Sequence, residues 1–209
     1  MKPHTFALLD IDTQNDFMIP EGKLYVPGAN LLKETLVALI QAAAAQHIPI
    51  LSSVDAHPAD DPEFAQFPPH CVIGTTGQQK IAGTRLNDAV TLPQRALTTT
   101  ERRRALQAPQ VILKKNVFDV FSNPNTEILL ERIAPDTVMV CGVATDYCVN
   151  AAVQGLLDRG YSVWLIEDAV AGVNPQQSQY TLNTFKTQGV KMTNANDVMM
   201  KWNTKEPVQ

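Results

Sequence analysis

The stretch Thr137-Val-Met-Val-Cys-Gly-Val143, followed by Ala144-Thr-Asp-Tyr-Cys148, decides the fold class. The first part is a nearly continuous apolar run, which is typical of a strand buried on both faces of a parallel sheet. Residues 144–157 then repeat apolar side chains at helical spacing, so a helix should follow this strand and cover the sheet. A buried strand that leads directly into an amphipathic helix predicts a βαβ unit.

Short apolar runs and helical patterns alternate along the rest of the chain. Further strands are predicted over residues 6–11, 48–54, 111–114, 162–167 and 190–192. Helices are predicted over residues 29–46, 126–133, 176–188 and 196–202, and a short one over 101–107, where Thr98 and Glu101 can form a capping box. We therefore expect one α/β domain over residues 1–209, with three α/β/α layers and a six-stranded, mostly parallel sheet.

Composition narrows the classes of function. The chain has 209 residues and a net charge of −4, which gives no electrostatic support for binding nucleic acid. No apolar run approaches the roughly 20 residues that span a bilayer, and acidic residues follow the start too soon for a signal peptide. Three cysteines do not make a disulfide framework, which fits a reducing compartment. We expect a cytoplasmic protein that acts on a small molecule and binds neither nucleic acid nor membrane.

Polar side chains follow four of the predicted strands: Asp12, Asp55, Lys115 and Cys148. Ligands bind outside the carboxyl ends of parallel strands, so these side chains should meet at one edge of the sheet. Cys148 opens a helix, where the macrodipole and free N–H groups favour a thiolate and can hold an oxyanion. Asp12 could shuttle the thiol proton, and Lys115 would keep Asp12 ionised and favour the thiolate. The pattern predicts a cysteine nucleophile.

The long connection over residues 56–110 is rich in proline, glycine and threonine, and connections of this length usually carry function. Asp55, His57 and His70 supply one carboxylate and two imidazoles at its start, a ligand set suited to one divalent ion of Zn, Fe or Mn with open positions. Other acids and thiols that stand out are interpreted as structural: Asp10, Asp16, Asp168, Cys71 and Cys141.

Several motifs in chain order carry a resemblance to a known family. They are Asp12-Thr-Gln-Asn-Asp-Phe17, Asp55-Ala-His57, Phe67-Pro-Pro-His-Cys-Val-Ile-Gly-Thr-Thr-Gly77, Lys115 with Phe121 following, and Gly142-Val-Ala-Thr-Asp-Tyr-Cys148. The ordered set resembles the isochorismatase-like cysteine hydrolases, and within that family it is similar to the nicotinamidases (pyrazinamidases). It spans residues 7–170 and is more specific than any of its parts.

The resemblance implies a catalytic triad in which Cys148 is the nucleophile, Asp12 the general acid and base, and Lys115 their electrostatic partner. It implies a cis peptide before Ala144, whose N–H would form an oxyanion hole with that of Cys148. It implies a metal held by Asp55, His57 and His70 that orients a pyridine ring, and a homo-oligomer. The activity implied is hydrolysis of nicotinamide to nicotinate and ammonia through a thioester, as in NAD salvage. The aromatic residues expected to line the ring pocket are Phe17, Phe67 and one of Phe118 and Phe121, between which the sequence does not choose.

Two departures from the family pattern bear on metal and substrate. Nicotinamidases commonly have Trp where Phe67 stands, although a Phe ring can still stack on a pyridine. Some also carry another metal-binding His between His57 and His70, where this chain has only the acids Asp60, Asp61 and Glu63.

Other functions remain open at this point. The same triad could hydrolyse another small amide or an N-carbamoyl compound. Asp10-Ile-Asp12 also resembles the nucleophile motif of haloacid-dehalogenase-type phosphatases, but Gln14 stands where that family has Thr or Val, and no later acidic pair is evident. A non-catalytic binding protein on the same scaffold is a further alternative, which the intact triad disfavours.

Overall fold

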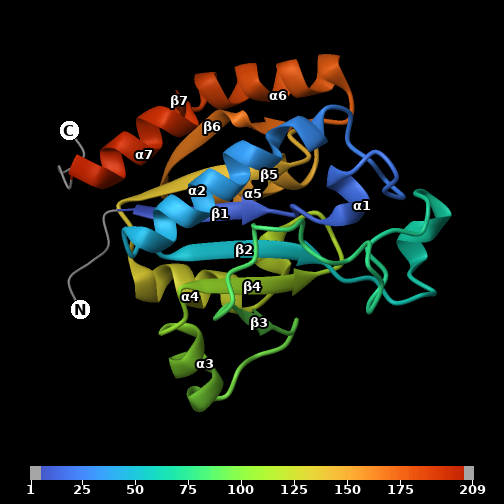
Figure 1. The fold of residues 1–209 in the computed structure, drawn as a ribbon, viewed down its shortest axis with the longest axis horizontal. Coiled ribbons are helices and arrows are strands. Elements are labelled where there is room, and N and C mark those ends of the chain that lie inside the picture. The colour runs from blue at the N-terminus through green and yellow to red at the C-terminus, as the bar shows by residue number, and fades with distance from the viewer. Residues whose placement is uncertain (1–5, 205–209) are drawn as a thin grey trace.

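The structure is a computed structural model that describes residues 6–204 (Figure 1). Seven strands form one parallel sheet in the order β3-β4-β2-β1-β5-β6-β7. Their bounds are β1 Phe6–Ile11, β2 Ile50–Asp55, β3 Val90–Leu92, β4 Gln110–Lys115, β5 Thr137–Val143, β6 Ser162–Ala171 and β7 Lys191–Thr193. The three-residue strands β3 and β7 form the two edges, so the longer strands lie inside the sheet.

The predicted count of six strands is wrong because the long connection contributes β3. Val90-Thr-Leu92 is too short to show a period in the sequence, and it becomes a strand by pairing with β4. The predicted α/β class and the parallel arrangement are confirmed. Strand β6 also continues past the predicted end at residue 167, to Ala171.

Helices cover both faces of the sheet. Their bounds are α1 Asn15–Met18, α2 Lys33–Ala45, α3 Thr99–Ala105, α4 Asn125–Ile133, α5 Cys148–Asp158, α6 Pro175–Thr187 and α7 Ala195–Thr204, with short 3₁₀ turns at Ala29–Leu32, Pro62–Ala65 and Val120–Ser122. Apolar side chains of α2 and α7 share one core with the sheet, and those of α4, α5 and α6 share the other. The helix predicted over residues 144–157 begins only at Cys148, because residues 144–147 form the turn that carries the chain from β5 into α5.

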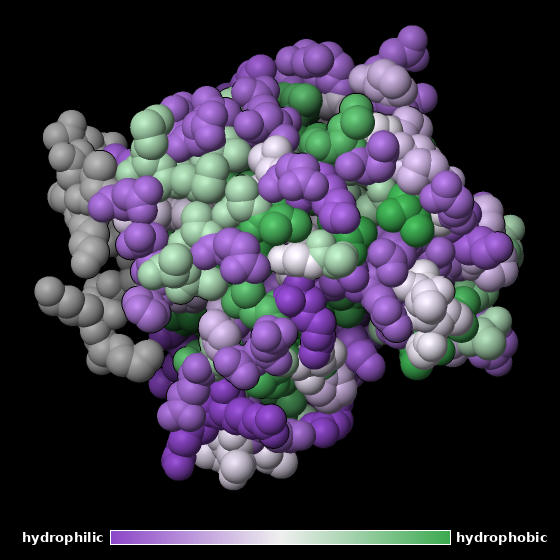
Figure 2. Space-filling model, viewed as in Figure 1, coloured by the Kyte–Doolittle hydropathy of each residue, from purple (hydrophilic) through white to green (hydrophobic). Residues whose placement is uncertain are grey.

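The surface seen in Figure 2 is mainly hydrophilic, with apolar residues scattered between charged and polar ones. Among the described residues, no helix has the length and apolar content needed to cross a bilayer.

Gly142 brings the ends of β5 and β1 close together. Its φ is +112°, and a Cβ at this position would lie 2.0 Å from the carbonyl oxygen of Ile11. Only glycine fits such an approach without a shift of the backbone. The residues that follow these two strands, Asp12 and the turn before Cys148, are thereby held beside each other.

Candidate active site

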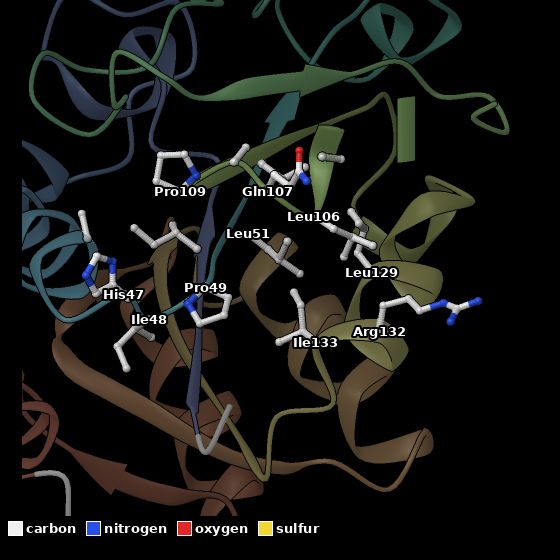
Figure 3. A pocket seen from close by; sticks show the side chains of 15 residues that line it. His47, Ile48, Pro49, Leu51, Leu106, Gln107, Pro109, Leu129, Arg132 and Ile133 are labelled. Atoms are coloured by element: carbon white, nitrogen blue, oxygen red, sulfur yellow. The ribbon is translucent and has the colours of Figure 1, made fainter. Parts of the chain in front are cut away.

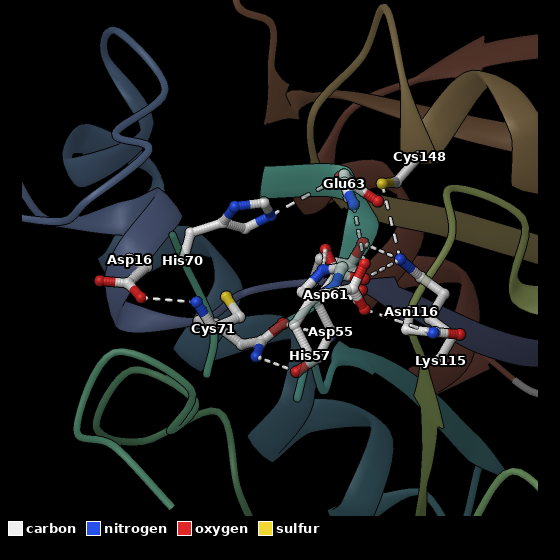
Figure 4. A network of polar contacts seen from close by, with 12 residues as sticks. Asp16, Asp55, His57, Asp61, Glu63, His70, Cys71, Lys115, Asn116 and Cys148 are labelled. Atoms are coloured by element: carbon white, nitrogen blue, oxygen red, sulfur yellow. Dashed lines mark hydrogen bonds and ion pairs between the residues drawn. The ribbon is translucent and has the colours of Figure 1, made fainter. Parts of the chain in front are cut away.

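Four adjacent strands, β4, β2, β1 and β5, deliver the candidate catalytic residues to one edge of the sheet. Lys115 is the last residue of β4 and Asp55 the last of β2, while Asp12 directly follows β1 and Cys148 opens α5 after β5. Figure 4 shows the Lys115 amino group pointing to the Cys148 sulfur and to the neighbouring carboxylates. The sequence predicted this convergence from the strand ends alone.

Lys115 connects the group. Its side chain is fully buried, and Nζ lies 2.7 Å from Asp12 Oδ2 and 3.6 Å from Cys148 Sγ, and it also contacts Asp55 Oδ1. Burial by itself lowers the pKa of Lys115, but the charges of Asp12 and Asp55 outweigh burial and raise that pKa well above its usual value. Lys115 is therefore a fixed positive charge between the thiol and both acids.

Cys148 is 6% exposed and is the first residue of α5, so its N–H has no acceptor within the helix. Burial raises the pKa of its thiol well above the usual range, and the attraction of Lys115 does not offset this. Burial likewise raises the pKa of Asp12 despite Lys115. Lys115 favours the thiolate, as predicted, but burial outweighs its attraction. A resting thiol has to lose its proton to a neighbour during reaction, and Asp12 is the base within reach.

The peptide bond between Val143 and Ala144 is cis, as the family resemblance implied. The carbonyl of Ala144 accepts hydrogen bonds from the N–H groups of Tyr147 and Val149, which fixes the turn that leads into α5. The N–H groups of Ala144 and Cys148, the two assigned to an oxyanion hole, lie at opposite ends of this turn.

The proposed metal ligands come together. Asp55, His57 and His70 each offer one ligand atom, and these atoms all lie within 4.8 Å of one another. His70 Nδ1 lies 2.8 Å from the carbonyl oxygen of Pro68, which can only accept, so this contact favours the tautomer with the proton on Nδ1 and a lone pair on Nε2. His57 Nε2 is buried without a hydrogen-bond partner and lies 3.8 Å from Asp55 Oδ2. Buried nitrogens that are left free in this way fit coordination of a divalent cation.

Two acids that the sequence did not assign to the metal site surround it. Asp61 Oδ2 lies 3.1 Å from His57 Nδ1, where a carboxylate can orient a metal-binding imidazole. Glu63 Oε1 lies 3.9 Å from His70 Nε2 and is near enough to add a ligand. Both acids lie between His57 and His70, the segment in which some nicotinamidases carry another His. Their position in this segment is the sequence feature that could have identified them.

A small cavity of about 70 Å³ opens onto Cys148 and the metal-ligand cluster. Among the predicted aromatic residues, Phe17, Phe67 and Phe118 line it. Phe121 does not, because its ring packs against Gly155 of α5 and lies 3.9 Å beneath the Arg159 guanidinium. Lining residues that the sequence did not single out are Leu24, Val26, Val143, Tyr147 and Val173. Tyr147 directly precedes the nucleophile, which is the one sequence signal among them.

The residues interpreted from the sequence as structural bind loop backbone, form an ion pair or lie buried. Asp16 accepts hydrogen bonds from the N–H groups of Lys23 and Cys71, and Asp168 accepts one from Ala195. Asp10 pairs with Lys80, whose Nζ lies 2.6 Å from Asp10 Oδ2. Cys71 and Cys141 are buried free thiols whose pKa is raised by burial.

A second cavity, of about 260 Å³, lies at the opposite ends of β2 and β4 (Figure 3). Leu51, Leu106 and Ile133 form part of its wall, and His47 and Arg132 stand at its sides. It contains none of the predicted catalytic residues or metal ligands.

Comparison with known proteins identifies the family of the chain. The isochorismatase domain family matches residues 6–197. The nicotinamidase of Escherichia coli is 29% identical, with 89% of this chain and 93% of that protein covered. A crystal structure of nicotinamidase/pyrazinamidase from Bacillus subtilis superposes with a TM-score of 0.77 at 25% identity, over 91% of this chain and 100% of that one. The pyrazinamidase of Pyrococcus horikoshii in complex with zinc has a TM-score of 0.74 at 26% identity, over 91% and 99%. The chain is a hydrolase of the isochorismatase family.

Proposed function

We propose that this protein is a nicotinamidase, which hydrolyses the carboxamide of nicotinamide to nicotinate and ammonia through a thioester on Cys148. The observation that carries the proposal is the buried Lys115 ammonium, which contacts Asp12, Asp55 and the Cys148 sulfur together. This contact joins the proton acceptor and nucleophile to the candidate metal site. The relatives named as nicotinamidases support the same reading.

In the first half of the reaction, Asp12 takes the proton of the Cys148 thiol and the thiolate attacks the carboxamide carbon. The N–H groups of Ala144 and Cys148 stabilise the oxyanion. When the C–N bond breaks, Asp12 returns the proton to the departing ammonia. Lys115 stays charged throughout and offsets the negative charge that passes between sulfur and carboxylate.

In the second half, a water molecule attacks the thioester and Asp12 takes one of its protons. The C–S bond then breaks, the proton on Asp12 returns to the sulfur, and the acid product gives its remaining proton to solvent and leaves as nicotinate. The resting thiol and the resting carboxylate are thereby restored.

Asp55, His57 and His70 would hold one divalent metal ion, with Glu63 near enough to complete the shell. When bound, such an ion supplies an open coordination position that can accept the pyridine nitrogen and orient the ring. The chain's own contribution is the contact of His70 Nδ1 with the Pro68 carbonyl, which orients one imidazole, and the carboxylate of Asp61 at 3.1 Å from His57 Nδ1, which can orient the other. Zn, Fe and Mn all suit this ligand set.

The cavity favours a small, neutral, planar substrate. Its lining is mostly apolar and aromatic, and the only charged residues in it are the acids Asp55 and Glu63 beside His70. A carboxylate-bearing N-carbamoyl substrate would meet no cationic side chain among these lining residues. We therefore rank an N-carbamoyl compound behind nicotinamide, and keep the hydrolysis of another small amide as the second candidate. A substrate panel separates these possibilities.

The direct test is ammonia release from nicotinamide by the purified, metal-loaded protein. We expect Cys148→Ala to lower kcat by about a thousandfold or more, because the nucleophile is lost. Cys141→Ala is the matched control, since Cys141 is a buried thiol within β5, and it should keep most of the activity. If Cys148→Ala keeps most of the ammonia release, the mechanism is wrong.

Two alternative functions, a phosphatase and a non-catalytic binding protein, would each be favoured by a different experimental result. Phosphate release that survives Cys148→Ala would favour a phosphatase that uses Asp10 and Asp12, although Asp10 is engaged with Lys80. A Cys148 that does not react with an electrophilic amide analogue would favour a binding protein. We expect the enzyme to work in the cytoplasm, where its three free thiols stay reduced.

A further inference from the structure

The two oxygens of the Asp12 carboxylate have different neighbours. Oδ1 accepts a hydrogen bond of 2.6 Å from the hydroxyl of Ser53, and Oδ2 lies 2.7 Å from Lys115 Nζ. Lys115 also contacts the Cys148 sulfur, so Oδ2 and the sulfur share one ammonium group. The carboxylate is thus held by a hydroxyl at one oxygen and by the Lys115 ammonium at the other.

Ser53 holds the backbone of Asp12 as well. The N–H of Asp12 lies 3.3 Å from both the carbonyl oxygen and the hydroxyl oxygen of Ser53. Both residues are fully buried, and the pairing of β1 with β2, which sets Asp10 opposite Ser52, fixes their alignment. Asp12 itself has a φ of +49°, outside the strand conformation, so contacts from the neighbouring strand determine where its side chain points.

We propose that Ser53 is a positioning residue, which locks the rotation of the Asp12 carboxylate so that Oδ2 faces the Cys148 thiol. The terminal torsion of Asp has a broad, two-fold profile, so a carboxylate without this bond can turn away from the productive orientation. The proposal rests on the proposed function in one respect only, that Asp12 is the base for Cys148. Nicotinamide does not have to be the substrate.

The chain offers a matched control in the adjacent residue. Ser52 is equally buried but faces the other side of β2, where its hydroxyl donates to Asp10 Oδ2 at 2.8 Å and accepts from Gln110 Nε2 at 2.9 Å. Ser52→Ala and Ser53→Ala each remove one buried hydroxyl that is bonded to a carboxylate. Only Ser53→Ala changes a contact of Asp12.

The experiment measures the reactivity of Cys148 without any substrate. The rate at which iodoacetamide alkylates Cys148 at a single pH is followed by peptide mass spectrometry, and ammonia release from nicotinamide is measured in parallel. We expect Ser53→Ala to slow alkylation and to lower kcat by about tenfold to a hundredfold, with KM nearly unchanged. Ser53→Thr, which keeps the hydroxyl, should recover most of both rates, and Ser52→Ala should affect neither by more than about twofold.

A variant pair tests whether Ser53 acts through Asp12. In an Asp12→Asn background, Ser53→Ala should lower the alkylation rate of Cys148 and kcat little further, because the effects of substitutions at two residues that act together are not additive. Equal losses for Ser52→Ala and Ser53→Ala, an unchanged alkylation rate in Ser53→Ala, or a wild-type Cys148 inert to iodoacetamide would each overturn the proposal. If the wild type does not release ammonia from nicotinamide but its alkylation still depends on Ser53, the proposed substrate fails and the role of Ser53 stands.

Discussion

At the scale of a single residue, Phe67 is the aromatic side chain whose substitution tests the assignment of the substrate pocket. Its ring meets those of Phe118 and Tyr147 edge to face, with centroids 6.2 Å from each. An aromatic contact adds about 0.5–1.5 kcal/mol to the free energy of area burial alone. Phe67→Ala should therefore raise KM for nicotinamide by about tenfold and change kcat less, as steady-state kinetics would show.

Phe121 provides the control for this prediction. Its ring lies outside the cavity, against Gly155 and beneath Arg159, so Phe121→Ala should reduce the free energy of unfolding and leave KM unchanged. A KM that rises equally in both variants would show that the pocket is assigned to the wrong rings.

The candidate catalytic residues could be predicted from the sequence because each stands at the end of an apolar run, and parallel strands end at the same edge of a sheet. The choice between Phe118 and Phe121 could not be made, because it depends on the 3₁₀ turn Val120–Ser122 between β4 and α4. The protonation of Cys148 was also beyond the sequence, since depth of burial, and not the sign of the neighbouring charge, decides it.

At the scale of an element, helix α3 depends on its capping box. The N–H of Glu101 donates to Thr98 Oγ1 at 3.3 Å, and the N–H of Thr98 donates to the Glu101 carboxylate at 2.9 Å. Loss of an N-cap side chain typically costs about 1 kcal/mol. Thr98→Ala should lower the free energy of unfolding by about that amount in urea titrations. Thr100→Ala, in the same turn, should change it by less than about 0.5 kcal/mol.

Acid should weaken the same cap. Hydrogen bonds from Arg95 and Thr98 lower the pKa of Glu101 to about 2. The folded-state pKa lies below the unfolded value of about 4.3. The ionised Glu101 therefore contributes to the free energy of unfolding above about pH 4.3, and this contribution disappears as the pH falls towards 2. If Thr98→Ala lowers the free energy of unfolding by the same amount across this pH range, the coupling of Thr98 and Glu101 is contradicted.

Most elements could be predicted to within a few residues, and β5 matches its predicted bounds. The capping box at Thr98 is confirmed because its residues are neighbours in the sequence and need no distant partner. The predicted helix over 29–46 instead opens with a 3₁₀ turn, Ala29–Leu32, before α2 begins at Lys33. Strand β3 was missed because the strand that it pairs with, β4, lies some twenty residues away in the sequence.

At the scale of the whole molecule, a bound metal should stabilise the fold. Asp55 ends a central strand while His70 lies in the long connection, so a shared ion would tie the connection to the sheet. A ligand present at a hundred times its Kd stabilises the native state by about 2.7 kcal/mol. For a chain of this size, adding Zn²⁺ to chelator-treated protein should raise Tm by about 5–10 °C in a thermal melt.

A pair of histidine variants controls this measurement. His70→Ala should abolish the shift in Tm, and His47→Ala, whose exposed side chain lies beside the cavity at the other end of the sheet, should keep it. A Zn²⁺-dependent shift that persists in His70→Ala would place the metal elsewhere. The homo-oligomer stays a prediction, which light scattering can test.

The edges of the sheet bear on how copies of this chain could associate. With only three residues each in β3 and β7, the sheet presents few unpaired amide and carbonyl groups to a neighbouring molecule. Extension of the sheet from one copy to the next, which is the route to fibrils, is disfavoured by geometry alone. Subunits that assemble would have to meet through helical faces or through the loops, where side chains, and not backbone pairing, select the partner.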